Sequence, residues 1–110
     1  MSKYSAKPCQ IGAEKYRSQR EAARHQELLR LQRQGLIAGL TREVPFVLAP
    51  SVRIAGEKRA RPAVRYYLDF LYTTALGETV AEDCKGMQTP VYRLKKHLMA
   101  TVHGLHVRES

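Results

Sequence analysis

Two segments of the chain place apolar or aromatic side chains at helical spacing. In residues 18–34 such side chains recur every three or four positions, and Gly35 supplies a stop. The recurring positions are Ala22, His25, Leu28 or Leu29, and Leu31. Residues 90–103 lie between a Thr89-Pro90 start and a Gly104 stop, and their apolar stripe consists of Val91, Leu94, Leu98 and Val102. The spacing predicts two helices, each packed through its stripe.

Four other segments are typical of strands. Residues 40–48 place Val44, Phe46 and Leu48 at alternate positions, and Pro45 favours an edge or a bulge. Residues 64–72 alternate more strongly, residues 79–85 form the next strand after a short turn, and residues 105–108 form a last one.

The alternation also predicts which side chains share a face. In residues 64–72 we expect one face to carry Tyr66, Leu68, Phe70 and Tyr72. Asp69 would lie on the opposite face. The short turn favours an antiparallel hairpin with residues 79–85, so Asp69 would share its face with Asp83 and Lys85. Glu82 would point the other way.

The order helix, strand, strand, strand, helix, strand predicts an α/β fold with a central mixed sheet flanked by helices. The length of 110 residues fits one domain. We therefore expect a single domain over residues 18–110. Residues 1–17 are polar and basic, and we expect them to form an arm that is disordered or loosely docked.

Charge indicates the class of partner. The formal net charge is +9 and the isoelectric point lies near 9.9. A polyanion is therefore expected, with nucleic acid favoured over an anionic membrane surface. No apolar run approaches the roughly 20 residues that span a bilayer, and the polar N-terminus lacks a signal-peptide core. We expect no membrane partner and a cytoplasmic protein.

The remaining metal-binding residue types give a weaker signal. Cys9 and Cys84 have no CxxC spacing, which favours free thiols in a reducing compartment. His97, His103 and His106 lie close together near the C-terminus. Structural zinc sites usually include closely paired cysteines or a tight histidine pair, so we expect these histidines to supply surface polarity or phosphate contacts instead.

Three ionisable residues stand out near the predicted hairpin. Asp69 interrupts an apolar strand, where a carboxylate is costly to bury without a cation or a metal ion. Asp83 and Lys85 share a strand face, and carboxylates with a nearby ammonium suit a hydrolytic phosphodiesterase site that binds Mg²⁺ through oxygen ligands. Alternatively, Asp83 and Lys85 form only an exposed ion pair.

The segments "YYLDFLY" and "VAEDCKG" resemble the signature of the PD-(D/E)xK nuclease superfamily, whose αβββαβ core has the same element order. More narrowly, the segments "SQREAARHQELLRLQRQGLI", "DFLY", "EDCKG" and "TPVYRLKKHLM" look like a small family of phage and prophage proteins of unknown function placed in that superfamily. Such proteins resemble Holliday-junction resolvase-like endonucleases. The resemblance implies a restriction-endonuclease-like fold in a protein encoded by a phage or prophage and active on recombination or repair DNA.

The resemblance assigns roles to particular residues. Asp69 would be the first acid, and Asp83-Cys84-Lys85 the D-x-K motif. Mg²⁺ or Mn²⁺ would bind between Asp69, Asp83 and the backbone carbonyl of Cys84, while Lys85 stabilises charge or orients the attacking water. Glu21 would add a metal or water ligand, although Ser18-x-x-Glu21 also fits a capping box. Glu82 is retained as an alternate acid.

Basic residues in two regions are candidates for DNA contact. They are Arg53, Lys58, Arg59, Arg61, Arg65, Lys95 and Lys96. The sequence therefore predicts a magnesium-dependent endodeoxyribonuclease that acts on branched or other DNA, with a homodimer expected so that two sites cut symmetric strands. Two alternatives stay open, a non-catalytic nucleic-acid-binding module and an assembly protein. The separation of Asp69 and Asp83 in space discriminates between these interpretations.

Overall fold

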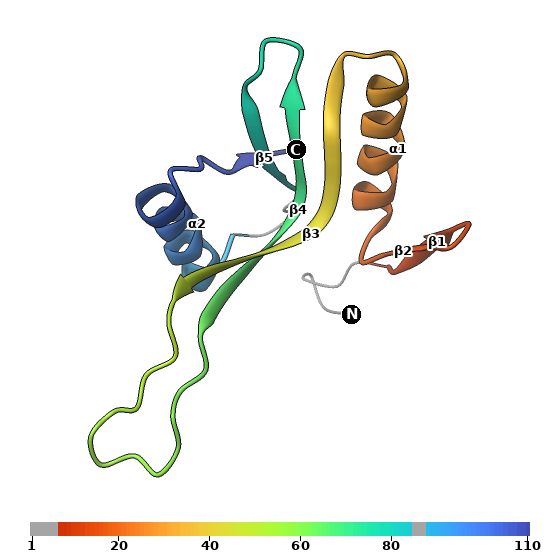
Figure 1. Ribbon diagram of the computed structural model, residues 1–110. Helices are drawn as coiled ribbons and strands as arrows, with labels where there is room; N and C mark the ends of the chain where they lie inside the picture. Colours follow the sequence, from red (N-terminus) through yellow and green to blue (C-terminus); the bar gives the residue numbers. More distant parts are fainter. Residues whose placement is uncertain (1–6, 85–87) are drawn as a thin grey trace.

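The computed structural model describes residues 7–84 and 88–110 and shows a mixed four-stranded sheet with one helix on each side (Figure 1). The sheet order is β3-β4-β5-β6, from β3 (Ile37–Ala49), β4 (Val64–Thr74), β5 (Thr79–Asp83) and β6 (Arg108–Glu109). The helices are α1 (Gln19–Arg33) and α2 (Pro90–His103). The predicted α/β class, with a mixed sheet and two helices, is confirmed.

Both helices begin and end at the predicted signals. The Ser18 hydroxyl accepts a hydrogen bond from the Glu21 amide at 3.1 Å, and the Thr89 hydroxyl accepts one from the Tyr92 amide at 3.1 Å. Gly104 ends α2 with a φ of 67°, a left-handed conformation that glycine adopts without strain. The caps therefore fix where each helix starts relative to the sheet.

The predicted stripe of α2 is wrong at three of its four positions. Val91, Leu94 and Val102 are 62%, 59% and 50% exposed, whereas Tyr92 and Met99 are buried. Tyr92 is held inward because its hydroxyl donates a hydrogen bond to Glu109 Oε2 at 2.8 Å. Leu98, the fourth predicted position, is partly buried and packs against the same cluster as Met99, so the buried face of α2 keeps one residue of the predicted stripe.

The sheet changes its packing partner part-way along β4. Tyr66 and Leu68 pack with Met99 of α2, whereas Phe70 and Tyr72 pack with Leu28 of α1. The prediction that the four alternate residues share one face is therefore wrong.

The change of packing partner falls between the paired positions Val44↔Leu68 and Arg42↔Phe70, where Glu43 stands on the neighbouring strand β3. Here Glu43 adopts a φ of 52°, the one positive value among the described non-glycine residues. The three consecutive residues Leu68, Asp69 and Phe70 are all buried at this point.

Part of the predicted N-terminal arm is an ordered hairpin. Strands β1 (Cys9–Ile11) and β2 (Glu14–Tyr16) pair antiparallel. Tyr16 is buried, and its hydroxyl lies 2.6 Å from His25 Nδ1 of α1. The expectation of a disordered or loosely docked arm is wrong for residues 9–16, because this buried contact attaches the hairpin to α1.

The other strands differ in extent from the prediction. β3 begins at Ile37 and continues beyond the predicted residues 40–48, and β6 consists of Arg108 and Glu109 rather than residues 105–108. β3 pairs antiparallel with β4 and β4 with β5, as predicted for the hairpin, whereas β5 and β6 are parallel. In the described part of the chain, no helix is long and apolar enough to cross a membrane.

Candidate functional site

The predicted acids Asp69 and Asp83 meet at the edge of the β4–β5 pairing. The register pairs Phe70 with Glu82, so Asp69 and Asp83 follow as the next opposed positions. The Asp69 amide donates a hydrogen bond to Asp83 Oδ1 at 3.2 Å, and the Cys84 amide donates one to Asp69 Oδ2 at 2.9 Å. Each aspartate is 1% exposed. The two strands thus bring the carboxylates together in a buried position.

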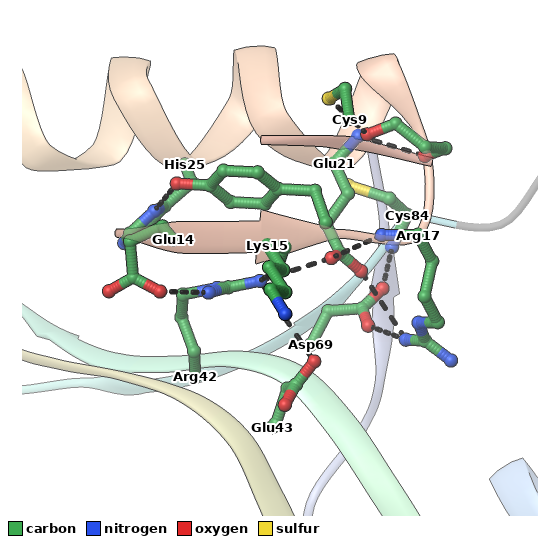
Figure 2. A network of polar contacts seen from close by, with 12 residues as sticks. Cys9, Glu14, Lys15, Arg17, Glu21, His25, Arg42, Glu43, Asp69 and Cys84 are labelled. Atoms are coloured by element: carbon green, nitrogen blue, oxygen red, sulfur yellow. Dashed lines mark hydrogen bonds and ion pairs between the residues drawn. The ribbon is translucent and has the colours of Figure 1, made fainter. Parts of the chain in front are cut away.

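Glu21 reaches the same place from the first turn of α1. Its side chain is buried, and its carboxylate lies beside Arg17 and Asp69 (Figure 2). The Ser18 hydroxyl caps the Glu21 amide, but Glu21 Oε1 lies 3.4 Å from the amide of Arg17. The capping contact by Ser18 and the placement of Glu21 in the acidic group therefore coexist.

A guanidinium group joins these carboxylates. Arg17 Nη2 contacts Asp69 Oδ1 and lies 3.3 Å from Glu21 Oε2 (Figure 2). The Arg17 side chain is nevertheless 61% exposed, although its partners are buried. Arg17 therefore brings positive charge to the acids from the solvent side.

A second arginine holds Glu21 from β3. Arg42 Nη2 lies 3.2 Å from Glu21 Oε1, and Arg42 Nη1 lies 2.7 Å from Glu14 Oε2 in β2 (Figure 2). The guanidinium carbon stands 4.3 Å from the centre of the Tyr16 ring. Arg42 thus connects the N-terminal hairpin, α1 and β3 through a single guanidinium group.

Burial and the neighbouring carboxyl group of Asp83 raise the pKa of Asp69 to about 8. Glu21 acts in the same direction, and the hydrogen bond from the Cys84 amide opposes the shift. Arg17 favours the charged form of Asp69, but burial and Asp83 outweigh this contact and hold the pKa of Asp69 above that of a free carboxyl group. Tyr66 fixes the other acid, because its hydroxyl donates a hydrogen bond to Asp83 Oδ2 at 2.8 Å.

The alternate acid, Glu82, is engaged elsewhere. Arg24 Nε and Nη2 lie 2.5 and 2.8 Å from its carboxylate oxygens, and the Tyr72 hydroxyl donates a hydrogen bond at 2.7 Å. Burial would raise the pKa of Glu82, but the hydrogen bonds from Arg24 and Tyr72 lower it below its ordinary value. Glu82 is thus held as a carboxylate in an ion pair with α1, separate from the contacts between Asp69 and Asp83.

Two further predictions concern the end of β5. Lys85 lies outside the residues that the structure describes. The Cys84 amide contacts Asp69, and burial raises the pKa of the Cys84 thiol. Among residues 7–84 and 88–110, no group of three histidine, cysteine or acidic side chains is arranged to hold a metal ion.

The predicted DNA-contacting cations lie on two surfaces. Those of the 50–63 connection and the start of β4 are exposed, and Figure 1 shows this connection extending away from the rest of the chain. Arg61 in this connection pairs with Glu57 at 2.8 Å. Lys95 and Lys96 lie on α2, where Lys96 Nζ is 3.3 Å from Glu109 Oε2.

Sequence reasoning missed three residues that shape the acidic group. Arg17 stands four residues before Glu21, a spacing that could have indicated an ion pair at the start of the helix. Arg42 and Tyr66 reach the acids through strand pairing, and no local pattern marks them. Pairing between strands that are distant in the sequence brings Arg42 and Tyr66 next to the acids.

Comparison with known families identifies the group to which the sequence belongs. The profile of DUF1064, described as a protein of unknown function, matches residues 1–107. The chain belongs to the DUF1064 family. No curated protein and no solved structure matches it. The family description names no activity, so the resemblance to PD-(D/E)xK nucleases stays a prediction.

The raised pKa of Asp69 predicts a specific dependence of stability on pH. The folded protein keeps a proton on Asp69 up to about pH 8, whereas the unfolded chain loses it near pH 4. Asp69 therefore makes the free energy of unfolding fall as pH rises between these values, by at most about 1.4 kcal/mol per pH unit. Asp69→Asn should remove this contribution, so its stability relative to the wild type should increase from pH 5.5 to pH 8.

Urea denaturation of both proteins in EDTA at several pH values measures this difference. Glu78→Gln, which replaces an exposed acid at the β4–β5 turn, is the matched control and should follow the wild-type profile. Parallel profiles for wild type and Asp69→Asn would contradict a raised pKa for Asp69.

Proposed function

We propose that this DUF1064 protein is a metal-dependent endodeoxyribonuclease that hydrolyses phosphodiester bonds. The observation that carries the proposal is the meeting of Asp69 and Asp83 on adjacent strands, with Glu21 joining them from α1. Sequence reasoning required this proximity for a nuclease, and separated aspartates would have excluded it. The formal net charge of +9 supports a polyanionic substrate.

Stability alone does not account for such a group. Burying carboxylates side by side is unfavourable because they lose water and repel one another. Apolar side chains of similar volume often serve a core as well as a buried ion pair does. Buried, mutually perturbed acids are instead frequent at catalytic sites. The arrangement therefore favours a functional reason for keeping Asp69 and Asp83 together.

The chemistry of the donor atoms fits Mg²⁺ or Mn²⁺, which prefer carboxylate and carbonyl oxygens. Asp69, Asp83 and the Cys84 carbonyl would hold the ion, with Glu21 as a further ligand. In the structure the oxygens of Asp69 accept hydrogen bonds from Arg17 and Cys84, and those of Asp83 from Asp69 and Tyr66. Arg17 thus supplies the positive charge beside Asp69, and an incoming ion would have to displace its guanidinium toward solvent, where 61% of the side chain already lies.

When bound, such an ion would activate water and stabilise charge on the phosphate. The protein's own groups would prepare the site. Tyr66 and the Asp69 amide fix the orientation of Asp83, and Arg42 fixes Glu21. Arg17, once released from Asp69, remains beside the site as a donor for a phosphate oxygen. Lys85 is proposed to stabilise developing charge or to orient the attacking water.

DNA binding is proposed to involve the exposed 50–63 connection and α2. The connection and the first residues of β4 carry Arg53, Lys58, Arg59, Arg61 and Arg65. Glu57 is the sole acid in residues 50–65, and it pairs with Arg61. This segment extends away from the sheet (Figure 1). It would therefore lie along a duplex or along one arm of a branched substrate. A homodimer would place two acidic groups on symmetric strands.

The proposed function also implies a cellular location and a class of DNA substrate. A phage or prophage nuclease for recombination or repair DNA would act in the cytoplasm of the bacterial host. The proposed substrates are branched DNA and other duplex forms, which the cleavage assay below separates.

A non-catalytic nucleic-acid-binding module is the second candidate. One observation favours it: the oxygens of the acidic group already have protein donors, and the described residues contain no three-ligand metal arrangement. In such a module, Arg17 and the acids would serve only to attach the N-terminal segment to the sheet.

Cleavage assays separate the two candidates. Asp83→Asn and Lys85→Ala should each abolish strand cleavage and leave DNA affinity close to that of the wild type, because dispersed cations bind DNA while the clustered groups perform the chemistry. Linear, nicked, flapped and four-way DNA should each be offered with Mg²⁺ and with Mn²⁺. Glu78→Gln is the control and should cut normally. Failure of folded, DNA-binding wild type to cut any substrate would leave the binding module as the function.

Metal binding tests the role of Arg17. Removing the competing guanidinium in Arg17→Ala should tighten Mn²⁺ binding by about five- to tenfold, the equivalent of about 1 kcal/mol for a partly exposed ion pair. Asp69→Asn should abolish binding, and Arg33→Ala at an exposed position of α1 should not change it. Titration calorimetry gives the affinities. Weaker Mn²⁺ binding by Arg17→Ala would contradict the competition.

Salt dependence tests the 50–63 connection. Removing one cation that neutralises a phosphate reduces the slope of log affinity against log salt by about 0.9. The triple variant Arg53→Gln, Lys58→Gln, Arg59→Gln should therefore lower that slope by about two to three units. The double variant Arg30→Gln, Arg33→Gln on α1 is the control for general charge and should lower it less. Equal slopes for the triple variant and the wild type, from fluorescence anisotropy, would remove the connection from the DNA interface.

A further inference from the structure

A cavity of about 360 Å³ lies between α2 and the segment that leads into β6. Its lining combines cationic and polar side chains with two small apolar ones, namely Gln88, Arg93, Lys96, His97, Ala100, His106 and Val107. Its volume falls in the range of small-ligand sites, which is about 300–1,000 Å³. The acidic group uses none of these residues, so the cavity needs an explanation of its own.

The charged side chains that line this cavity are cationic. Among the described residues, no aspartate or glutamate lines it. Glu109 adjoins the lining, 3.3 Å from Lys96 Nζ and 2.9 Å from Gln88 Nε2, so its carboxylate compensates part of the Lys96 charge and occupies the Gln88 amide donor. Within the described part of the chain, the side chains of Arg93, His97 and His106 have no polar partner. Their donors therefore remain available for an anion.

The mixture of groups indicates which anion. A guanidinium donates two parallel hydrogen bonds to phosphate oxygens, and an ammonium adds a point charge. Each imidazole adds a single donor. Ala100 and Val107 supply a small apolar wall against which a sugar ring can pack. We propose that this cavity binds a phosphate group of nucleic acid, with the adjoining sugar against Ala100 and Val107.

The cavity is connected to the acidic group through the sheet. Val107 directly precedes β6, and β6 pairs Glu109 with Asp83 of β5. A series of contacts also joins them, because Tyr92 bonds Glu109, its ring lies 6.3 Å from that of Tyr66, and Tyr66 bonds Asp83. A phosphate held in the cavity would therefore be coupled to Asp83 through these side chains. This link to cleavage rests on the proposed function, whereas phosphate binding does not.

A strand contains two kinds of phosphate group. A terminal phosphate carries about −1.5 to −2 charges at neutral pH, and an internal phosphodiester carries one. Several converging donors favour the terminal group, so a 5′-phosphorylated dinucleotide, pTpT, should bind about tenfold or more tightly than TpT. This factor corresponds to one additional charge-assisted hydrogen bond.

The test is a titration of the isotopically labelled full chain in EDTA, followed by amide NMR shifts. The probes are pTpT, TpT and inorganic phosphate at constant ionic strength. Wild type should show shifts at the amides that line the cavity. Arg93→Gln should weaken pTpT binding about tenfold, whereas Arg33→Gln, which removes one charge from α1, should not. Ala100→Leu fills the cavity without changing charge and should weaken binding in the same way.

Each outcome has a distinct meaning. Unchanged pTpT affinity in both Arg93→Gln and Ala100→Leu overturns the site. Equal affinity for pTpT and TpT, with weaker binding in both variants, supports the site and assigns it to internal phosphates. Binding of inorganic phosphate without either dinucleotide overturns it as a nucleic-acid site. Because no metal is present and no bond is cut, these results stand whether or not the protein is a nuclease.

Discussion

The close approach of Asp69 and Asp83 is the constraint around which the rest of the chain is arranged. Two carboxyl groups buried together require a shared proton, hydrogen-bond donors and positive charge. The protein supplies them from separate parts of the chain, through Tyr66, the Cys84 amide and Arg17. The N-terminal hairpin, α1 and β3 each contribute to this environment, which explains why a segment expected to be loose is instead docked.

Local signals in the sequence were sufficient to predict both helices and the presence of a sheet. Ser18, Thr89, Pro90 and Gly104 act through contacts within a few residues of themselves, so their effect can be read from the sequence. The pairing of the strands around Asp69 and Asp83 also followed from a short turn between two alternating segments. For the same reason the two aspartates could be predicted to lie together.

Features that depend on distant partners could not be read in this way. The buried Tyr92 of α2 bonds Glu109 of β6, and the change of face along β4 falls opposite Glu43 of another strand. Arg42 belongs to the site because β3 lies beside β4, a relation that no periodicity reports. The nuclease chemistry itself rests on resemblance and on the acidic group, and Lys85 lies outside the described residues.

The change of face along β4 divides the interior into two packing units, one under α1 and the other under α2. Asp69 lies on the boundary between them, since Leu68 belongs to one unit and Phe70 to the other. The carboxylates therefore lie where the two packing units meet, so a substitution that shifts one unit relative to the other is expected to change the distance between their oxygens. Substitutions deep in each half can then tune the acidic group without touching it, while the sheet itself keeps its strand order.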